Sequence, residues 1–393
     1  MNAAFVDAFA ALGVAIPNIL LPGPEVDLSK FAVVACDQHV SDPSYWEAVE
    51  AYVGDAPSAL RLMLPEAYLE QPDRALRVAG INAAMQEYLD RGLLREVGEG
   101  FVYLQRTITT GVRHGLMMAL DLEQYDYTPG AKSLIRATEQ TIPERLPPRV
   151  EIRRDAVLEL PHIMVLVDDP DNLLLGAVEQ ALPTLPRCYD FDLMQQSGHL
   201  TGWLVQEEEL LLRLADALKI LCERGEGLLF AMGDGNHSLA TAKACWEQQK
   251  RTLSESERAT HPARFALCEI VNLHDEAMVF EPIHRVLFSV DEKALERETG
   301  IRGDKMPPLQ QLQPLLDAYL AAHPETRIDY VHGEQAARDL GSKPGNLALL
   351  MPPFDKSSLY DIVRHDGVLV RKSFSLGEAP DKRFYLEARK ITR

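Results

Sequence analysis

The segment from Leu228 to Ala244 constrains the fold more than any other part of the sequence. It reads LLFAMGDGNHSLATAKA, in which a short apolar run leads into Gly233-Asp234-Gly235 and then into residues that favour a helix. This pattern predicts a buried strand, a tight turn and a helix. Strand and helix patterns alternate along the rest of the chain as well. We therefore predict an α/β fold of mixed sheets with flanking helices, with a mixed α+β arrangement as the alternative.

The Gly-Asp-Gly turn has the chemistry of a phosphate site. Gly235, like Gly233, allows a positive φ and the close approach of a ligand to the backbone. The helix that follows presents N–H groups and the positive end of its dipole near Asn236 and Ser238, which suits a phosphate. Asp234 can hold Mg²⁺ or accept a proton from a hydroxyl. The alternative is that Asp234 or Asn236 only caps the helix.

Known phosphate and nucleophile motifs do not account for this turn. The sequence lacks G-x-x-x-x-G-K-[ST] and G-x-S-x-G, so the turn is neither a P-loop nor a nucleophile elbow. It also lacks H-E-x-x-H, so no transition-metal site is indicated.

The net charge of −19 makes nucleic acids and anionic membranes poor partners for this chain. Positive charge is nevertheless gathered in two segments. Residues 132–155 carry six basic and four acidic side chains, and residues 364–393 carry eight basic and four acidic ones. Because arginine matches phosphate oxygens in pairs, either segment can neutralise a phosphate. A small phosphate donor in a basic pocket therefore stays compatible with the acidic surface.

Three other segments contain candidate site residues. Residues 128–155 are rich in proline and arginine, and we expect a long ordered loop with a functional role; a solvated, salt-bridged loop is the alternative. Asp37 and Gln38 follow the apolar run 31–36, at a strand end where α/β proteins bind ligands, although a capped loop explains them equally well. His284 follows a further strand, but a lone histidine is more often structural.

Hydrophobic periodicity predicts the other elements. Helices are expected at 44–53, 75–91, 207–223, 238–249, 308–322 and 357–365, and strands at 31–36, 101–109, 116–122, 163–167, 228–232, 266–273, 278–280, 327–331 and 347–351. Ser254 and Glu257 fit a capping box. We expect a main catalytic region over 1–295 and a smaller α/β region over 296–393 whose basic tail contributes to the site.

The cysteines and the N-terminal segment indicate the compartment. Five cysteines are present without a C-x-x-C pair, which favours reduced thiols over a disulfide framework or a zinc site. No apolar run approaches the roughly 20 residues of a membrane span. The first residues also lack the basic start of a signal peptide. We therefore expect a cytoplasmic protein with no membrane partner.

Several long motifs together resemble one family over nearly the whole chain. They are VVACDQHVSDPSYWEAVE at 33–50, SLIRATEQTIPERLPPRVEIRRDAVLELPHIMVLVDD at 133–169, LLFAMGDGNHSLATAKA at 228–244, FEPIHRV at 280–286 and RKSFSLGEAPDKRFYLEARKI at 371–391. On these motifs the chain resembles family 1015 of the domains of unknown function. More narrowly, it resembles the anaerobe-type branch of that family, which is associated with serine biosynthesis.

The resemblance implies a function. The turn is similar to that of free-serine kinases of the ParB and sulfiredoxin-like superfamily, which cradle phosphates with the turn and the following helix. The branch implies a pyrophosphate-dependent kinase that makes O-phosphoserine from L-serine. Where the broader family reads Asp-Gly-His-His-Arg, this chain ends the motif with Ser238, and the loss of the arginine fits a donor smaller than a nucleoside triphosphate. An ATP- or ADP-dependent serine kinase, a phosphoserine phosphatase and a nucleotide-sensing regulatory protein are the alternatives.

The resemblance also implies roles for individual residues. Mg²⁺ is expected to bridge donor oxygens at Asp234, and either Asp234 or Asp37 is expected to be the base. The residues expected to hold or neutralise the donor phosphates are Gly235, Asn236, His237, Ser238, Lys243, Arg136, Arg145, Arg149, Lys372, Lys382 and Arg383. His237 is also a catalytic candidate, and Glu139 is expected to bind the serine ammonium group. The other residues expected at the substrate are Gln38, Thr138, His284 and Arg285.

Overall fold

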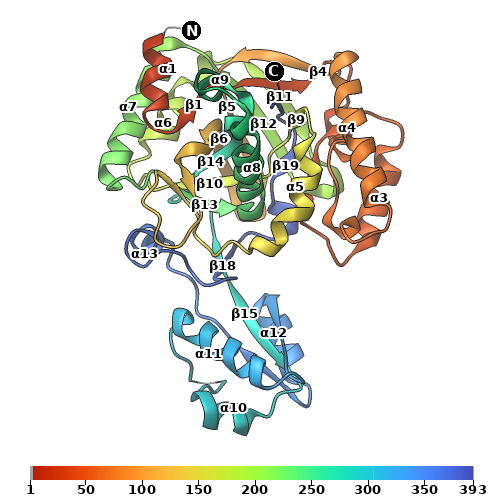
Figure 1. The fold of residues 1–393 in the computed structure, drawn as a ribbon, viewed down its shortest axis with the longest axis vertical. Helices are drawn as coiled ribbons and strands as arrows, with labels where there is room; N and C mark the ends of the chain where they lie inside the picture. Colours follow the sequence, from red (N-terminus) through yellow and green to blue (C-terminus); the bar gives the residue numbers. More distant parts are fainter. Residues whose placement is uncertain (1–2, 304, 393) are drawn as a thin grey trace. The chain divides into compact units, whose positions relative to one another are not determined.

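The computed structural model describes residues 3–303 and 305–392, and its chain divides into two compact units (Figure 1). The first unit comprises Met1–Ala137, Thr141–Met278 and Glu378–Arg393, and the second comprises Thr138–Gln140 and Val279–Gly377. The expected boundary after residue 295 lies inside the second unit, within helix α10 (Glu292–Thr299). Strand β15 (Phe280–Phe288) already belongs to the second unit because its partners in pairing come later in the chain.

The first unit is built on one large mixed sheet, which confirms the predicted fold class. Its strands run in the order β11, β12, β5, β6, β14, β10, β13, β8, β7, and β1 also pairs with β6. Pairing is parallel between β10 and β14, β8 and β13, and β7 and β8. The bounds are β1 (Val14–Ala15), β5 (Phe101–Ile108), β6 (Gly111–Asp121), β7 (Tyr125–Asp126), β8 (Ile135–Arg136), β10 (Met164–Val167), β11 (Arg187–Asp192), β12 (His199–Val205), β13 (Phe230–Asp234) and β14 (Phe265–Asn272).

Both faces of this sheet are covered. Side chains alternate between the two faces along a strand, so Met118 of β6 joins one hydrophobic core while Met117 joins the other. Helices α1, α6, α7 and α8 cover the first face, and α3 and α4 pack with the second core. The helix bounds in this unit are α1 (Ala3–Ala10), α2 (Leu28–Phe31), α3 (Pro43–Val53), α4 (Arg74–Asp90), α5 (Leu146–Arg154), α6 (Leu173–Ala181), α7 (Glu208–Arg224), α8 (Asn236–Gln249) and α9 (Glu255–Thr260).

Short two-stranded sheets bring the C-terminal segment back into the first unit. Strand β19 (Phe384–Tyr385) pairs with β3 (Val33–Val34), and β20 (Arg389–Lys390) pairs with β9 (Leu158–Glu159). A third pair joins β2 (Asn18–Pro22) to β4 (Leu94–Glu99). These pairings place the basic tail beside the strand that precedes Asp37.

Most elements agree with the sequence-based predictions. The helix predicted at 207–223 is α7, with Leu211, Leu214, Leu218 and Leu221 buried, and the capping box at Ser254 and Glu257 is present. The helices at 44–53, 75–91, 238–249, 308–322 and 357–365 are found within a few residues of the expected bounds, as are the strands at 101–109, 163–167, 228–232, 266–273, 327–331 and 347–351.

Some predictions were wrong in detail. Residues 128–155 are not one long loop, because their last part forms α5. Pro147 and Pro148 occupy its first turn, where a helix needs no backbone N–H donors and proline is tolerated. The strand expected over 31–36 shortens to β3, since Phe31 ends helix α2. The strand expected at 116–122 begins earlier, at Gly111, because β6 forms a hairpin with β5, and the strand expected at 278–280 is the start of β15.

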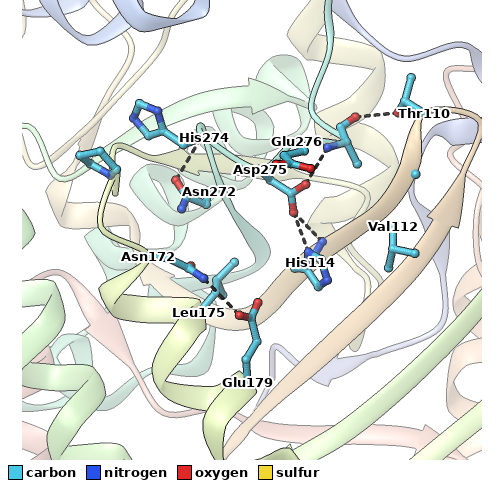
Figure 2. Close-up of a pocket in the computed structure, with 13 residues that line it drawn as sticks. Thr110, Val112, His114, Asn172, Leu175, Glu179, Asn272, His274, Asp275 and Glu276 are labelled. Atoms are coloured by element: carbon cyan, nitrogen blue, oxygen red, sulfur yellow. Dashed lines mark hydrogen bonds and ion pairs between the residues drawn. The ribbon is translucent and has the colours of Figure 1, made fainter.

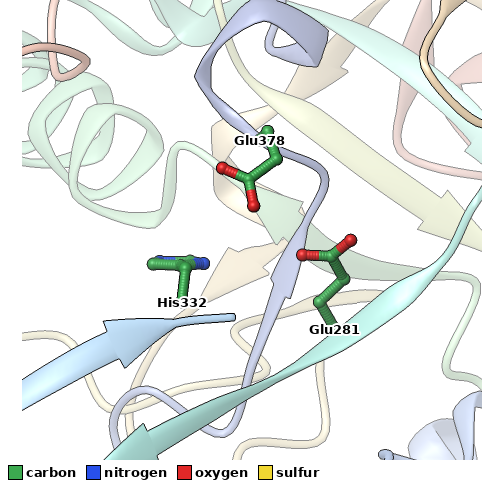
Figure 3. Close-up of side chains that lie close together, drawn as sticks. All are labelled: Glu281, His332 and Glu378. Carbon is green, nitrogen blue, oxygen red and sulfur yellow. The ribbon is translucent and has the colours of Figure 1, made fainter. Parts of the chain in front are cut away.

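The second unit is a smaller α/β structure around β15. This strand pairs with β16 (Arg327–His332), β17 (Asn346–Leu349) and β18 (Phe374–Leu376), all antiparallel. Figure 3 shows two of its polar side chains, Glu281 on β15 and His332 at the end of β16, together with Glu378, the first residue of the last segment of the first unit. The helices of this unit are α10, α11 (Leu309–Ala322), α12 (Glu334–Gly341) and α13 (Leu359–His365).

Two further expectations concern the cysteines and the membrane. All five cysteines are free thiols, as predicted. Within the described part of the chain, no helix is both long enough and apolar enough to cross a bilayer.

Candidate functional site

The predicted strand, turn and helix are found at β13, Gly235 and α8. Gly235 is the N-cap of α8 and has a φ of 76°, the left-handed region that favours glycine. Glycine has no side chain that could cap α8, and no side-chain hydrogen bond is made from this N-cap position. An uncapped helix N-terminus retains a positive field that attracts anions.

Replacing Gly235 with alanine should destabilise the turn by about 1–2 kcal/mol, the usual cost of a left-handed backbone for a residue with a Cβ. The new Cβ would also lie 3.0 Å from the Cα of Ile163. The matched control is Gly80→Ala in α4, where an added Cβ meets nothing within 4 Å and helix propensity favours alanine. Urea unfolding gives the free energy of unfolding of both variants. Equal free energies for Gly235→Ala and Gly80→Ala would contradict the predicted cost of the left-handed backbone.

Asp234 forms a partly buried ion pair with Lys382 of the C-terminal segment. Its Oδ2 accepts a hydrogen bond from the Lys382 ammonium at 2.9 Å, and its Oδ1 accepts one from the Gly235 N–H at 2.9 Å. The Lys382 side chain is 10% exposed and the Asp234 side chain 26%. The structure thus joins a carboxylate and an ammonium group at the mouth of an uncapped helix.

The surroundings of Asp234 keep it ionised. Burial alone would raise the pKa of its carboxyl, but the charge and hydrogen bond of Lys382, together with His162 and the Gly235 N–H, hold that pKa below its ordinary value. An ionised Asp234 is a stable partner for Lys382 or a cation and only a weak proton acceptor.

A buried histidine, His162, lies beside this pair and was not predicted as a site residue. Its Nε2 is 3.0 Å from the Ser238 hydroxyl on the first turn of α8, and its Nδ1 is 2.7 Å from the Tyr385 hydroxyl. Tyr385 in turn accepts a hydrogen bond from the Cys36 N–H at 3.2 Å. The imidazole therefore connects the first turn of α8 to the C-terminal segment.

Asp37 approaches the same histidine from the end of β3. One of its carboxylate oxygens is 3.9 Å from His162 Nε2, and the other accepts a hydrogen bond from the Gln38 side chain at 2.9 Å. The pairing of β3 with β19 places this carboxylate close to Tyr385, two residues beyond Arg383. Asp37, Asp234 and Ser238 thus gather around one imidazole ring.

The segment before α5 runs over the start of α8. His237 Nε2 accepts the Ile142 N–H at 3.4 Å, and the Asn236 side-chain oxygen lies 3.4 Å from the Thr141 hydroxyl and 3.5 Å from the Tyr125 hydroxyl. Helix α5 then packs along α8 (Figure 1). This arrangement brings the basic segment predicted from sequence next to the turn.

The basic candidates of the first unit differ in their surroundings. Arg149 on α5 pairs with Glu66, and Arg145, at the N-cap of that helix, is exposed. Arg136 lies on β8, paired with β13, and its Nε donates to the Ser133 carbonyl at 2.8 Å. Lys243 lies further along α8, donates to the Leu122 carbonyl at 2.8 Å and pairs with Glu247. Their predicted phosphate contacts stay predictions.

Arg383 is held deep inside the first unit. It donates to the Pro161 carbonyl at 2.9 Å and to Glu269 at 2.7 Å, and it also pairs with Glu387. Because Arg383 follows Lys382 directly, these contacts fix the backbone from which Lys382 reaches Asp234.

The remaining candidates belong to the second unit, and only their contacts inside that unit are described. Glu139 accepts the Ser373 N–H at 2.9 Å, and burial raises the pKa of its carboxyl. His284 accepts the Met351 N–H at 3.0 Å, and Arg285 donates to Gln313 at 3.3 Å. Thr138 and Lys372 also lie in this unit. Their roles toward a substrate stay predictions.

His162 and Tyr385 are the residues that sequence reasoning missed. His162 stands just before the strand predicted at 163–167, and Tyr385 stands in the basic tail. Antiparallel pairing of β10 with β13 places Met164 opposite Asp234, so the residues just before β10, His162 among them, lie beside the turn that follows β13. A polar residue just before a predicted strand was the available signal for His162. Which residues it would contact could not be predicted, because that depends on the order of the strands in the sheet.

Comparison with known proteins identifies the family of this chain. The DUF1015 family profile, described as a protein of unknown function, matches residues 20–305. The chain belongs to the DUF1015 family. This confirms the resemblance drawn from the sequence motifs. No curated protein matches the chain.

Several solved structures are similar to this DUF1015 chain. A conserved hypothetical protein from Pyrococcus furiosus has 12% sequence identity and a TM-score of 0.34, covering 69% of this chain and 95% of that one. A free serine kinase in complex with AMP has 10% identity and a TM-score of 0.37, covering 70% and 92%. A variant of a free serine kinase in complex with ADP has 10% identity and a TM-score of 0.38, with the same coverage.

Proposed function

We propose that this protein transfers a phosphoryl group from pyrophosphate to the hydroxyl of L-serine, giving O-phospho-L-serine and orthophosphate. The observation that carries the proposal is the Asp234–Lys382 pair at the uncapped start of α8. Phosphoryl transfer requires positioning and charge neutralisation more than covalent help from the protein. The ammonium group and the helix N-terminus supply charge neutralisation, and the nearby carboxylates supply positioning and a proton acceptor. We place the activity in the cytoplasm, in keeping with five free cysteines.

In this proposal the donor phosphates lie against the first turn of α8 and Lys382. The Oγ–P bond of phosphoserine forms as the bridging P–O bond of pyrophosphate breaks, and orthophosphate leaves. The serine hydroxyl proton goes to a carboxylate. Because Lys382 lowers the pKa of Asp234, we assign proton acceptance to Asp37 and assign to Asp234 the positioning of Lys382 and the donor.

His162 and Tyr385 position this site. The imidazole holds the Ser238 hydroxyl at 3.0 Å, and the Tyr385 hydroxyl fixes the other side of the ring. In the broader family an arginine stands at the position of Ser238. The short serine, bonded to a buried histidine, leaves no long cation to reach a third phosphate, which favours pyrophosphate over a nucleoside triphosphate.

A magnesium ion fits this site only together with the donor. In the described part of the first unit, no three His, Cys, Asp or Glu side chains converge to hold an ion by themselves. Mg²⁺ commonly uses one or two carboxylates plus substrate phosphates, and Asp234 provides one such carboxylate. When bound, Mg²⁺ would neutralise charge on the donor oxygens.

A donor comparison tests the proposal. The full-length protein is incubated with L-serine, MgCl₂ and either pyrophosphate, ATP, ADP or CTP, and O-phosphoserine is quantified by mass spectrometry. We expect pyrophosphate to give the highest kcat/KM. A preference for ATP or ADP would show that the donor is a nucleotide and not pyrophosphate, while the proposed serine kinase activity would stand. Hydrolysis of added O-phosphoserine without synthesis would indicate a phosphatase, and nucleotide binding without any turnover would indicate a regulatory protein.

A further inference from the structure

A polar cavity lies in the first unit, at the other end of β10 from Asp234. It has a volume of about 380 Å³ (Figure 2). Asp234 pairs with Met164 at the start of β10, whereas the cavity is bordered by Pro170 and Asn172, which follow the end of that strand. The cavity is therefore separate from the phosphate turn, although both use the same strand.

The position of the cavity is typical of a ligand site. Strands β10 and β14 are parallel, and their carboxyl ends both lead into the cavity wall. Ligands of open α/β sheets bind outside such ends. The β5–β6 turn at Thr110–Val112 and the side of α6 complete the wall. The volume is at the small end of the range of about 300–1,000 Å³ for small-molecule sites, so it suits a ligand of few heavy atoms.

One side of the cavity is anionic. Glu179 on α6 accepts a hydrogen bond from the Tyr103 hydroxyl at 3.2 Å and another from the Asn172 amide at 3.1 Å, which fixes its carboxylate. Glu276, which directly follows Asp275, is exposed. The described lining contains neither lysine nor arginine. This composition disfavours a phosphate and favours a ligand that brings an ammonium group.

Two histidines also line the cavity, and each is held by an aspartate. His114 Nδ1 is 2.9 Å from Asp275, which also accepts the His114 backbone N–H at 3.0 Å. His274 Nε2 is 2.7 Å from Asp168. The hydrogen bond from Asp275 raises the pKa of His114 above its ordinary value against the effect of burial. In a protonated His114, Nδ1–H stays with Asp275 and Nε2–H is left to donate to a carboxylate ligand.

We infer that this cavity binds a free amino acid in its zwitterionic form. The ammonium group would face Glu179, and the carboxylate would face His114. The apolar part of the lining is short and restricts the ligand side chain to a small one; it consists of Val112, Pro170, Leu175 and Ala277. The inference goes beyond the proposed function, because the site is separate from the turn and needs no phosphate donor.

Calorimetric titration tests the ligand class on the full chain carrying Asp234→Ala, which disturbs the proposed donor site and leaves this cavity intact. The probes are L-serine, ethanolamine, which lacks the carboxylate, and lactate, which lacks the ammonium group. We expect saturable binding of L-serine and at least tenfold weaker binding of each half-ligand. Equal binding of ethanolamine or lactate, or no saturable binding of L-serine, would overturn the inference. Loss of phosphoserine synthesis in the same protein concerns only the proposed function.

Variants locate the binding. Glu179→Gln and His114→Gln should each weaken L-serine binding at least tenfold, whereas the same Glu→Gln change at Glu209, an exposed residue of α7, should not alter it. Thermal unfolding of each variant identifies any that fails to fold. The comparison of L-serine with ethanolamine and lactate tests the ligand class without any substitution in the cavity. L-serine affinity unchanged in folded Glu179→Gln and His114→Gln would overturn the assignment to this cavity.

Discussion

Asp234→Ala should lower kcat for O-phosphoserine formation by at least about 100-fold, the scale on which positioned charge and acid–base groups act. The change removes the carboxylate that holds the Lys382 ammonium at 2.9 Å and leaves that ammonium, in a side chain only 10% exposed, without this partner. Lys382 would no longer be fixed at the start of α8, where we place the donor phosphates. Steady-state kinetics with L-serine and pyrophosphate measures the effect.

Two further variants make this result specific. Asp216→Asn, on the exposed side of α7, is the control for loss of an acidic residue and should turn over like wild type. Asp37→Asn should also reduce kcat, because it removes the proposed proton acceptor while leaving the Asp234–Lys382 pair intact. Near-wild-type turnover of Asp234→Ala would remove Asp234 from the mechanism.

Glu269→Ala should lower the free energy of unfolding by about 3–5 kcal/mol, the cost of breaking a buried ion pair. Glu269 is completely buried on β14 between Arg113, whose Nε is 3.1 Å away, and Arg383, whose Nη1 is 2.7 Å away. Without Glu269, Arg113 loses its buried carboxylate partner. Arg383 loses one of its two carboxylate partners and keeps Glu387. Gly115 leaves the space for this side chain, since a Cβ there would lie 2.5 Å from a Glu269 oxygen.

Urea unfolding of wild type, Glu269→Ala and the exposed control Glu209→Gln measures this loss. The pH dependence has a defined sign. Burial alone would raise the pKa of Glu269, but Arg113 and Arg383 hold it below its ordinary value. The stabilisation is therefore complete above the unfolded pKa of about 4.3 and is lost as the pH falls through the lower native pKa. Equal stability of Glu269→Ala and wild type at pH 7 would contradict this account.

Local patterns in the sequence were sufficient for the elements around the site. The apolar run before Gly233, the glycine at 235 and the helix formers after it predicted β13, the turn and α8, because strand and helix periods and glycine conformations are properties of neighbouring residues. The leucine stripe of α7 was predictable for the same reason. Family motifs then pointed to Lys382, which the structure places on Asp234.

Other features depend on long-range pairing and were not predictable. His162 becomes a neighbour of Ser238 only because β10 runs antiparallel beside β13, and Tyr385 joins them only because β19 pairs with β3. Helix α5 was missed because consecutive prolines favour a loop unless they fall in the first helical turn. The polar cavity at the end of β10 brings together segments from β6, α6 and the end of β14, and the sequence contained no motif that joins them.

Transfer of a phosphoryl group from pyrophosphate to L-serine can be followed by a ³¹P NMR time course of the full-length protein with L-serine, pyrophosphate and MgCl₂. The same mixture containing Asp234→Ala is run beside it. We expect the pyrophosphate signal to fall while O-phosphoserine and orthophosphate rise in equal amounts, and to change far more slowly in the variant. Orthophosphate appearing as two equivalents without O-phosphoserine, or no change in the pyrophosphate signal, would contradict the claim.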